Sequence, residues 1–341
     1  MSPNPPRTPP DLVSDPAAPD TAPGVPVAAG TSDTADSTEA ATATAVATMP
    51  TRPPLGQSTT ATARRKRKNI TMIVVLSAVL ALAIAVLVWV LGYVAAEGLK
   101  YLSPQFLTHT PPGNPSAGGG GFANGIIGSL IIVGIATAIS IPIGIAAAVY
   151  LHEYGGRVAK VARFVTDVLV GVPTIVTGAF VYALIVIRYG YSGYAGAIAL
   201  AAIMLPLIIR ATEEMLRTVP RELREASLAL GISKSRTIVS IVLPTASSGI
   251  ITGCMLAIAR AMGETAPLLL TVLGNDLFVE TNPDHRMATL SLQVFSNAIT
   301  GFQAAQGRAW AGALTMVLLV LIFTAIARIA GRRTAVSGGK R

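Results

Sequence analysis

The sequence predicts an all-α polytopic membrane protein with about six transmembrane helices. Of its 341 residues, 52% are hydrophobic and only 13% are charged, which is too little charge to solvate the surface of a soluble domain of this size. Several apolar runs are long enough to cross a hydrocarbon layer of about 30 Å, which takes about 20 helical residues. The single cysteine, Cys254, lies inside one of these runs, so the chain can form no internal disulfide.

The chain divides by composition into three parts. Residues 1–63 are rich in Pro, Ala and Thr and contain no aromatic residue, so they predict a disordered cytoplasmic tail that cannot bury enough apolar area to offset its ordering entropy. Residues 64–333 contain all the long apolar runs and form the predicted transmembrane domain. Residues 334–341 form a short C-terminal tail.

The apolar runs place the spans along the chain. They lie at Ile70–Ala96, Ile126–Leu151, Phe164–Ile187, Gly193–Ile209, Ala246–Thr271 and Trp310–Ala330. An even number of spans puts both termini on one side of the membrane. The net charge of +9 gathers at span ends and in alternate loops, which indicates topology and not nucleic-acid binding. By the positive-inside rule, the basic cluster Arg64–Lys68 and both termini are cytoplasmic.

Two segments are expected on the outer face. Residues 97–125 contain several prolines and the run Gly118–Gly121, so they predict an irregular loop. Residues 272–308 are acidic at first and then place Met287, Leu290 and Val294 on one helical face. This pattern predicts a short helix that lies along the membrane surface or caps a cavity.

The longest cytoplasmic loop, residues 213–244, contains a predicted amphipathic helix. Pro220 suits a first helical position, Gly231 suits the position just after a helix end, and Arg221 and Glu225 stand four residues apart as a possible ion pair. By itself, such a helix could dock on a partner or simply solvate the loop.

The spacing within this loop resembles the EAA loop of ABC importer permeases. The stretch Glu225-Ala226-Ser227, three residues, Gly231, nine residues and Ile241-Val242-Leu243-Pro244 departs from the pattern only at Ser227. The resemblance implies a coupling helix that inserts into a cytoplasmic ATPase. Glu225, Ala226, Arg221 and Arg224 would serve this contact, and Gly231 would end the helix.

The chain itself has no Gly-x4-Gly-Lys-Ser/Thr phosphate loop. We therefore expect a transporter subunit that is not an enzyme by itself and holds no cofactor, with ATP and Mg bound by the partner ATPase. The three histidines are scattered without ligand spacing, so we expect no metal centre.

The fifth predicted span contains two charged residues, Arg260 and Glu264, one helical turn apart. Charges at membrane depth cost about 2.5–3.5 kcal/mol on insertion scales and mark candidate functional sites. Arg260 offers a fork of donors to an anion, Thr265 adds a hydroxyl, and Gly263 and Pro267 thin and bend the helix. The alternative is a buried pair that only fixes helix packing.

Residues 259–269, Ala-Arg-Ala-Met-Gly-Glu-Thr-Ala-Pro-Leu-Leu, resemble the signature of phosphate-specific ABC permeases, in particular the A-type subunit. The stretch Gly171–Gly178, with Pro173 as a helix-shaping residue, is similar to a second segment of that family. The resemblance implies the type I ABC importer permease fold in a bacterial plasma membrane, with inorganic phosphate as cargo.

The implied partners are a C-type phosphate permease subunit as a heterodimer partner, two copies of the ATPase, an external phosphate-binding protein and membrane lipid.

Three alternatives remain at this stage. The same class could carry sulfate or molybdate, because one arginine does not discriminate among tetrahedral anions. An ion-coupled secondary carrier would need no ATPase, and the spacing of the coupling loop disfavours it. A regulatory membrane scaffold would use the Arg260–Glu264 pair only to hold helices together.

Overall fold

The computed structural model describes the backbone of residues 60–337 and the side chains of residues 64–329. The predicted disorder of the N-terminal tail falls on residues 1–59 for the most part, and these lie outside the described range, as do residues 338–341. The chain divides into two units at Leu76, and the helical bundle belongs to the second unit.

The regular structure of the described part is helical. In chain order the helices are α2 (Thr60–Tyr101), α3 (Pro104–Thr108), α4 (Ala123–Glu153), α5 (Gly156–Gly171), α6 (Thr174–Val181), a π-helical segment (Tyr182–Val186), α7 (Ile187–Tyr189), α8 (Gly193–Arg217), α9 (Arg221–Ala229), α10 (Lys234–Thr237), a second π-helical segment (Ile238–Val242), α11 (Leu243–Gly263), α12 (Ala266–Thr271), α13 (Leu290–Ala298) and α14 (Gln303–Ser337).

Five helices of the described part are long and apolar enough to cross a membrane, and a bent pair raises the number to six. The prediction of an all-α protein with about six spans is confirmed. The most deeply buried span is α8, whose residues Leu200, Met204 and Ile208 are fully buried in the main core. This helix packs against α4, α11 and α5, so it forms the centre of the bundle.

The third predicted span, Phe164–Ile187, is not one straight helix. It consists of α5 followed by α6 and α7, with a bend of 105° between the two parts. The bend lies at Val172, which has φ −70° and ψ 129°, because a residue before proline is driven out of the helical region. Pro173 thus breaks the span instead of merely shaping it.

The fifth predicted span, Ala246–Thr271, is also broken. The long helix α11 ends at Gly263, Glu264 is extended with φ −74° and ψ 125°, and α12 starts at Ala266. Pro267 explains the position of the break, because its ring would clash with the carbonyl of the residue four places earlier, which is Gly263. The expectation that Arg260 and Glu264 share one continuous helix is therefore wrong.

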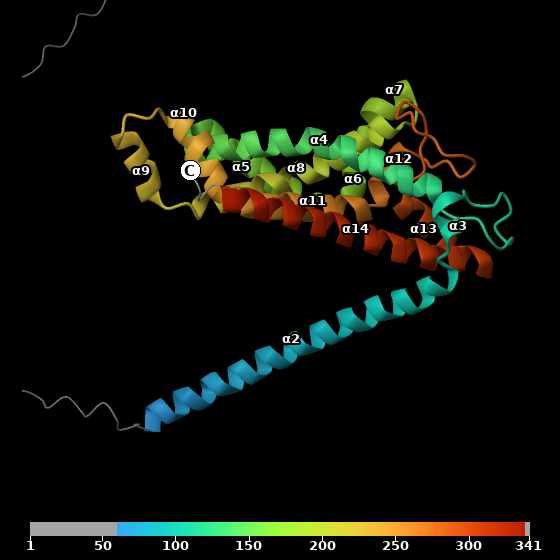
Figure 1. The fold of residues 1–341 in the computed structure, drawn as a ribbon, viewed down its shortest axis with the longest axis horizontal. Helices are drawn as coiled ribbons and strands as arrows, with labels where there is room; N and C mark the ends of the chain where they lie inside the picture. Colours follow the sequence, from blue (N-terminus) through green and yellow to red (C-terminus); the bar gives the residue numbers. More distant parts are fainter. Residues whose placement is uncertain (1–59, 338–341) are drawn as a thin grey trace, which may run out of the picture. The chain divides into compact units, whose positions relative to one another are not determined.

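Figure 1 shows how the loops of the second unit are distributed. The short helices α9 and α10 lie at one end of the bundle, and α3 and α7 lie at the opposite end. The predicted helix after residue 272 is present as α13, which begins at Leu290, so Met287 precedes it; both residues are buried.

Candidate functional site

The helices that follow the two breaks pack directly against each other. Gly178 of α6 lies so close to α12 that a Cβ atom added to it would stand 2.6 Å from Pro267 Cα. Only glycine permits this approach. The two segments that resemble family signatures, far apart in sequence, thus form a single structural unit in the bundle.

A cavity of about 190 Å³ lies beside this unit, and Arg260 lines it. Thr174 and Thr177, from the first turn of α6, contribute hydroxyl groups. The rest of the lining is apolar and comes from α5, the bend and α8: Leu169, Val170, Val172, Ala202, Ile203, Leu205, Pro206 and Leu207. A few polar groups in an apolar cavity is the usual composition of a small-ligand site.

Sequence analysis did not single out Thr174 and Thr177. The available signal was the placement of two hydroxyl residues just after Pro173, where a new helix begins. A first helical turn offers unpaired backbone N–H groups and a positive partial charge. The hydroxyls and this helix end therefore favour an anion at the same cavity as Arg260.

Arg260 and Glu264 form an ion pair across the end of α11, with 3.3 Å between Arg260 Nε and Glu264 Oε1. The arginine side chain is 53% exposed in the isolated chain, whereas the glutamate is only 15% exposed. A guanidinium facing lipid at this depth would be costly. The exposed part of Arg260 therefore belongs to a water-filled cavity or to a partner surface.

The extended residue Glu264 is held in place by a contact from α13. Ser291 of α13 is buried, and its hydroxyl donates a hydrogen bond of 3.0 Å to the Glu264 carbonyl. Sequence analysis did not identify this contact, since it joins residues far apart. It links α13 to the backbone beside the ion pair.

Thr265 and Gly263 flank the break. Thr265 caps α12, and its carbonyl accepts a hydrogen bond of 3.0 Å from the Leu269 amide. A Cβ atom on Gly263 would have no neighbour within 4 Å. The bundle therefore does not need a thin helix at Gly263, and the shaping role expected for it has no support within the described chain.

In the coupling segment, residues 213–244, helix α9 ends where predicted. Gly231 follows α9 with φ +77°, a left-handed conformation that favours glycine. At the start, Pro220 is the capping residue and the helix begins at Arg221. Arg221, Glu225 and Ala226 are exposed, and no Arg221–Glu225 ion pair forms among the described side chains.

Arg224 behaves differently from its neighbours. Its Nη1 stands 2.6 Å from Glu153 Oε1 at the end of α4. Its Nη2 donates a hydrogen bond of 2.9 Å to the Leu216 carbonyl in α8. Of the residues expected to contact an ATPase, Arg224 is the one that the structure turns toward its own chain.

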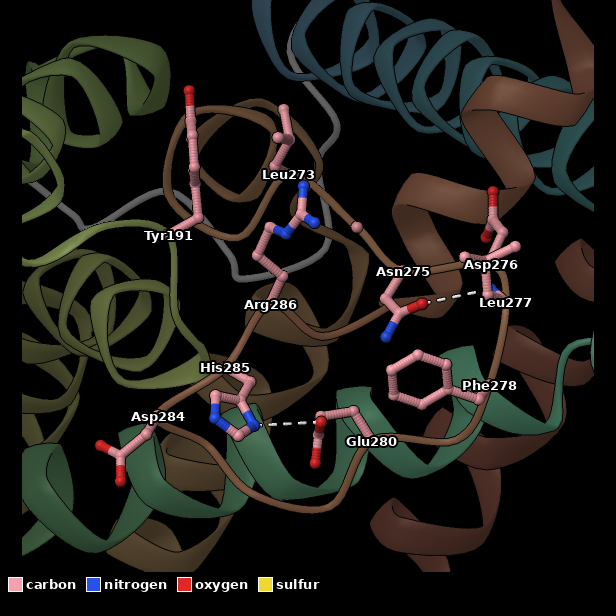
Figure 2. Close-up of a pocket in the computed structure, with 11 residues that line it drawn as sticks. Tyr191, Leu273, Asn275, Asp276, Leu277, Phe278, Glu280, Asp284, His285 and Arg286 are labelled. Carbon is pink, nitrogen blue, oxygen red and sulfur yellow. Dashed lines mark hydrogen bonds and ion pairs between the residues drawn. The ribbon is translucent and has the colours of Figure 1, made fainter.

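A larger hollow of about 800 Å³ lies at the end of the bundle that carries α7 (Figure 2). In it, His285 Nδ1 stands 3.1 Å from Glu280 Oε2. The pKa of Glu280 lies below its usual range, chiefly because the Asn282 amide donates to the carboxylate. The lining also includes Asp276 and Asp284, and its carboxylates make it a poor cavity for an anion.

Comparison with known proteins finds a matching family and similar solved structures. The family described as "Binding-protein-dependent transport system inner membrane component" matches residues 140–336, more than half of the chain, including both breaks and the coupling segment. A solved structure described as an amino acid ABC transporter with histidines aligns over 62% of this chain and 93% of its own, with 18% identity and a TM-score of 0.48.

Curated relatives are more similar in sequence. The phosphate transport system permease protein PstA of Yersinia pestis is 43% identical over 271 residues, covering 78% of this chain and 91% of the relative. PstA 1 of Mycobacterium tuberculosis (strain ATCC 25618 / H37Rv) is 41% identical over 265 residues, covering 76% of this chain and 86% of the relative. The chain is thus a multi-pass membrane permease, and it belongs to the family of binding-protein-dependent transport system inner membrane components, among the permeases named PstA.

Proposed function

We propose that the chain is the permease subunit of an ATP-driven ABC importer that moves inorganic phosphate into the cytoplasm by alternating access. The relatives that are 41–43% identical carry the name of phosphate transport permeases. The observation that carries the proposal is the position of Arg260, which lines the cavity beside the two packed breaks. A positive group, two hydroxyls and a helix start converge there.

The chemistry of these groups suits a phosphate ion in transit. Arg260 presents a planar guanidinium fork that matches two phosphate oxygens. Thr174 and Thr177 can donate to the remaining oxygens. These contacts offset the loss of hydration as the anion enters an apolar passage.

Glu264 acts as the counter-ion when no cargo is present. It holds Arg260 at 3.3 Å, so the guanidinium is not left unpaired in the empty permease. An incoming phosphate competes with Glu264 for the guanidinium and is repelled by the carboxylate. This competition keeps the site from binding the cargo too tightly to release it. Thr265, beside the break, supplies a further hydroxyl along the path.

The partners follow from the coupling segment. Glu225, Ala226, Arg221 and the turn at Gly231 dock on a cytoplasmic ATPase, which binds ATP and Mg, so this chain needs no ATP site of its own. Two copies of the ATPase serve a heterodimer of this chain with a C-type permease. An external phosphate-binding protein delivers the cargo. In this proposal α9 and both termini lie in the cytoplasm.

Labelled phosphate uptake in cells that lack their own high-affinity system tests the proposal. The chain is supplied with its partner permease, ATPase and binding protein, and excess sulfate is added in a parallel arm. We expect uptake that requires this chain and resists sulfate. Uptake abolished by sulfate would instead assign a broader oxyanion cargo, and uptake independent of the ATPase would indicate a secondary carrier.

A further inference from the structure

Polar contacts of two side chains, Arg224 and Ser227, hold α9 to the rest of the chain at the coupling end of the bundle. The first joins Arg224 of α9 to Glu153, the last residue of α4. The second joins the hydroxyls of Ser227 in α9 and Thr237 in α10 at 2.8 Å. Both hydroxyl residues are only 3% exposed, so this contact is a buried one.

The Arg224–Glu153 contact lies in a largely enclosed place. The Arg224 side chain is 20% exposed and the Glu153 side chain 8%. The contact is an ion pair without hydrogen-bond geometry, because neither Glu153 Oε1 nor Arg224 Nε makes a hydrogen bond. Coulomb attraction between partly buried charges is screened less than at an exposed surface, so the pair resists separation.

Further bonds gather around the same pair. Arg224 Nη2 donates to the Leu216 carbonyl of α8 at 2.9 Å and also lies 3.2 Å from His152 Nε2. Lys234 Nζ donates to the Glu153 carbonyl at 2.5 Å. One arginine therefore ties the coupling helix to the ends of both α4 and α8.

The helices tied in this way lead to the candidate site. α4 and α8 pack tightly on each other, and α8 residues Ala202, Ile203 and Pro206 line the Arg260 cavity. A displacement of α9 is thus transmitted through Arg224 to the helix that forms one wall of the cavity. The exposed residues of α9, Arg221, Glu225 and Ala226, remain available to a docking partner.

We propose that Arg224 and Glu153 are positioning residues for transport, which make α9 move as one body with the cytoplasmic ends of α4 and α8. In this assignment, which rests on the proposed function, Arg224 does not bind the ATPase but transmits the motion of α9 to α4 and α8. Ser227 also helps to fix the position of α9. Its hydroxyl bond to Thr237 closes the coupling segment on itself, which accounts for serine where the family pattern has a third small apolar residue.

The test uses the complete importer, reconstituted in lipid vesicles with its partner permease, ATPase and binding protein. Three readouts are taken: co-purification of the ATPase, stimulation of ATP hydrolysis by phosphate-loaded binding protein, and labelled phosphate uptake. The variants are Glu153→Gln, Arg224→Gln and the charge swap Glu153→Arg with Arg224→Glu. Arg236→Gln is the matched control, an arginine of the neighbouring helix α10 that is exposed and makes no ion pair among the described side chains.

We expect both single variants to retain the ATPase while stimulation and uptake fall by about tenfold, because each leaves one partly buried charge unpaired. The charge swap should restore at least half of the stimulation. Arg236→Gln should retain stimulated hydrolysis within about twofold, because an exposed charge without an ion-pair partner contributes little. If a single variant does not accumulate in the membrane, the stimulation measured for the charge swap tests the assignment alone.

The opposite pattern overturns the assignment. If Arg224→Gln loses the ATPase while Glu153→Gln keeps full stimulation, or if the swap restores nothing, then Arg224 contacts the ATPase directly. Failure of the proposed function gives a different result. The wild-type complex would then take up no phosphate and show no stimulation by phosphate-loaded binding protein. Co-purification of the ATPase with Arg224→Gln and with Glu153→Gln would still test whether Arg224 contacts the ATPase.

Discussion

The close contact between the two breaks makes Gly178→Ala a sharp test of the site. A Cβ at position 178 would stand 2.6 Å from Pro267 Cα and 3.1 Å from Pro267 Cβ, whereas ordinary contact begins at 3.4 Å. The helices α6 and α12 must therefore separate by about 0.8 Å, and overpacking of this kind costs about 1–3 kcal/mol. Backbone atoms of Pro267 cannot rotate away, so the strain moves the helices.

The separation shifts Thr174 and Thr177 relative to Arg260. A misplacement of about 1 Å at a functional site can lower activity by up to about a hundredfold, so we expect phosphate uptake to fall by roughly tenfold to a hundredfold. The assay is initial-rate uptake of labelled phosphate, normalised to the amount of permease in the membrane. Complex assembly, measured by co-purification of the ATPase, should remain intact.

Gly134→Ala is the matched control. Gly134 also lies within a membrane helix, α4, and a Cβ there has no neighbour within 4 Å. This variant should transport at the wild-type rate, because replacing glycine by alanine in a helix with open space is favourable by about 1 kcal/mol. Normal uptake by Gly178→Ala, with the same amount of protein, would refute the claim that packing of the two breaks positions the site.

Two further predictions concern α13 and the loop that precedes it. Ser291→Ala removes the hydrogen bond to the Glu264 carbonyl, and we expect the thermal midpoint of the purified permease to fall in proportion to a loss of about 1–3 kcal/mol. The control is Ser296→Ala, whose hydroxyl bonds within α13 and whose loss should have little effect. Equal midpoints for the two variants would contradict the role of Ser291. The lowered pKa of Glu280 means that its contribution to order in the loop of residues 272–289 is complete above the ordinary glutamate pKa and is lost as the pH falls through the lowered value. The protection of that loop against hydrogen exchange, corrected for the intrinsic pH dependence of amide exchange, should therefore fall at acidic pH in the wild type and change less in Glu280→Gln. Identical pH profiles of protection would contradict this.

The sequence could predict the number and placement of spans because membrane crossing depends on local apolar length. It could also predict the end of α9, since Gly231 is a local signal for a left-handed turn. The break at Val172 had a local signal as well, the following Pro173, but the apolar run continues through it. A hydropathy pattern reports apolar length and does not report direction, so the bend was missed.

The direction of Arg224 could not be predicted from the sequence. Glu153 and Leu216, its partners, come from two other helices, and neither lies within helical range in the sequence. The same holds for Ser291 and for the approach of Gly178 to Pro267. Such contacts depend on the packing of distant segments, which local patterns do not determine.

The measurement that tests the central claim most directly is phosphate uptake by the Arg260→Ala importer. Arg157→Ala, an exposed arginine near the start of α5, serves as the control. Charged hydrogen bonds contribute about 1.5–3 kcal/mol each, equivalent to roughly tenfold to a hundredfold in rate, and we expect losses in this range for Arg260→Ala with the complex intact. Arg260→Lys should recover only part of the rate, because it keeps the charge but lacks the planar fork. Wild-type uptake by an assembled Arg260→Ala importer would contradict the account.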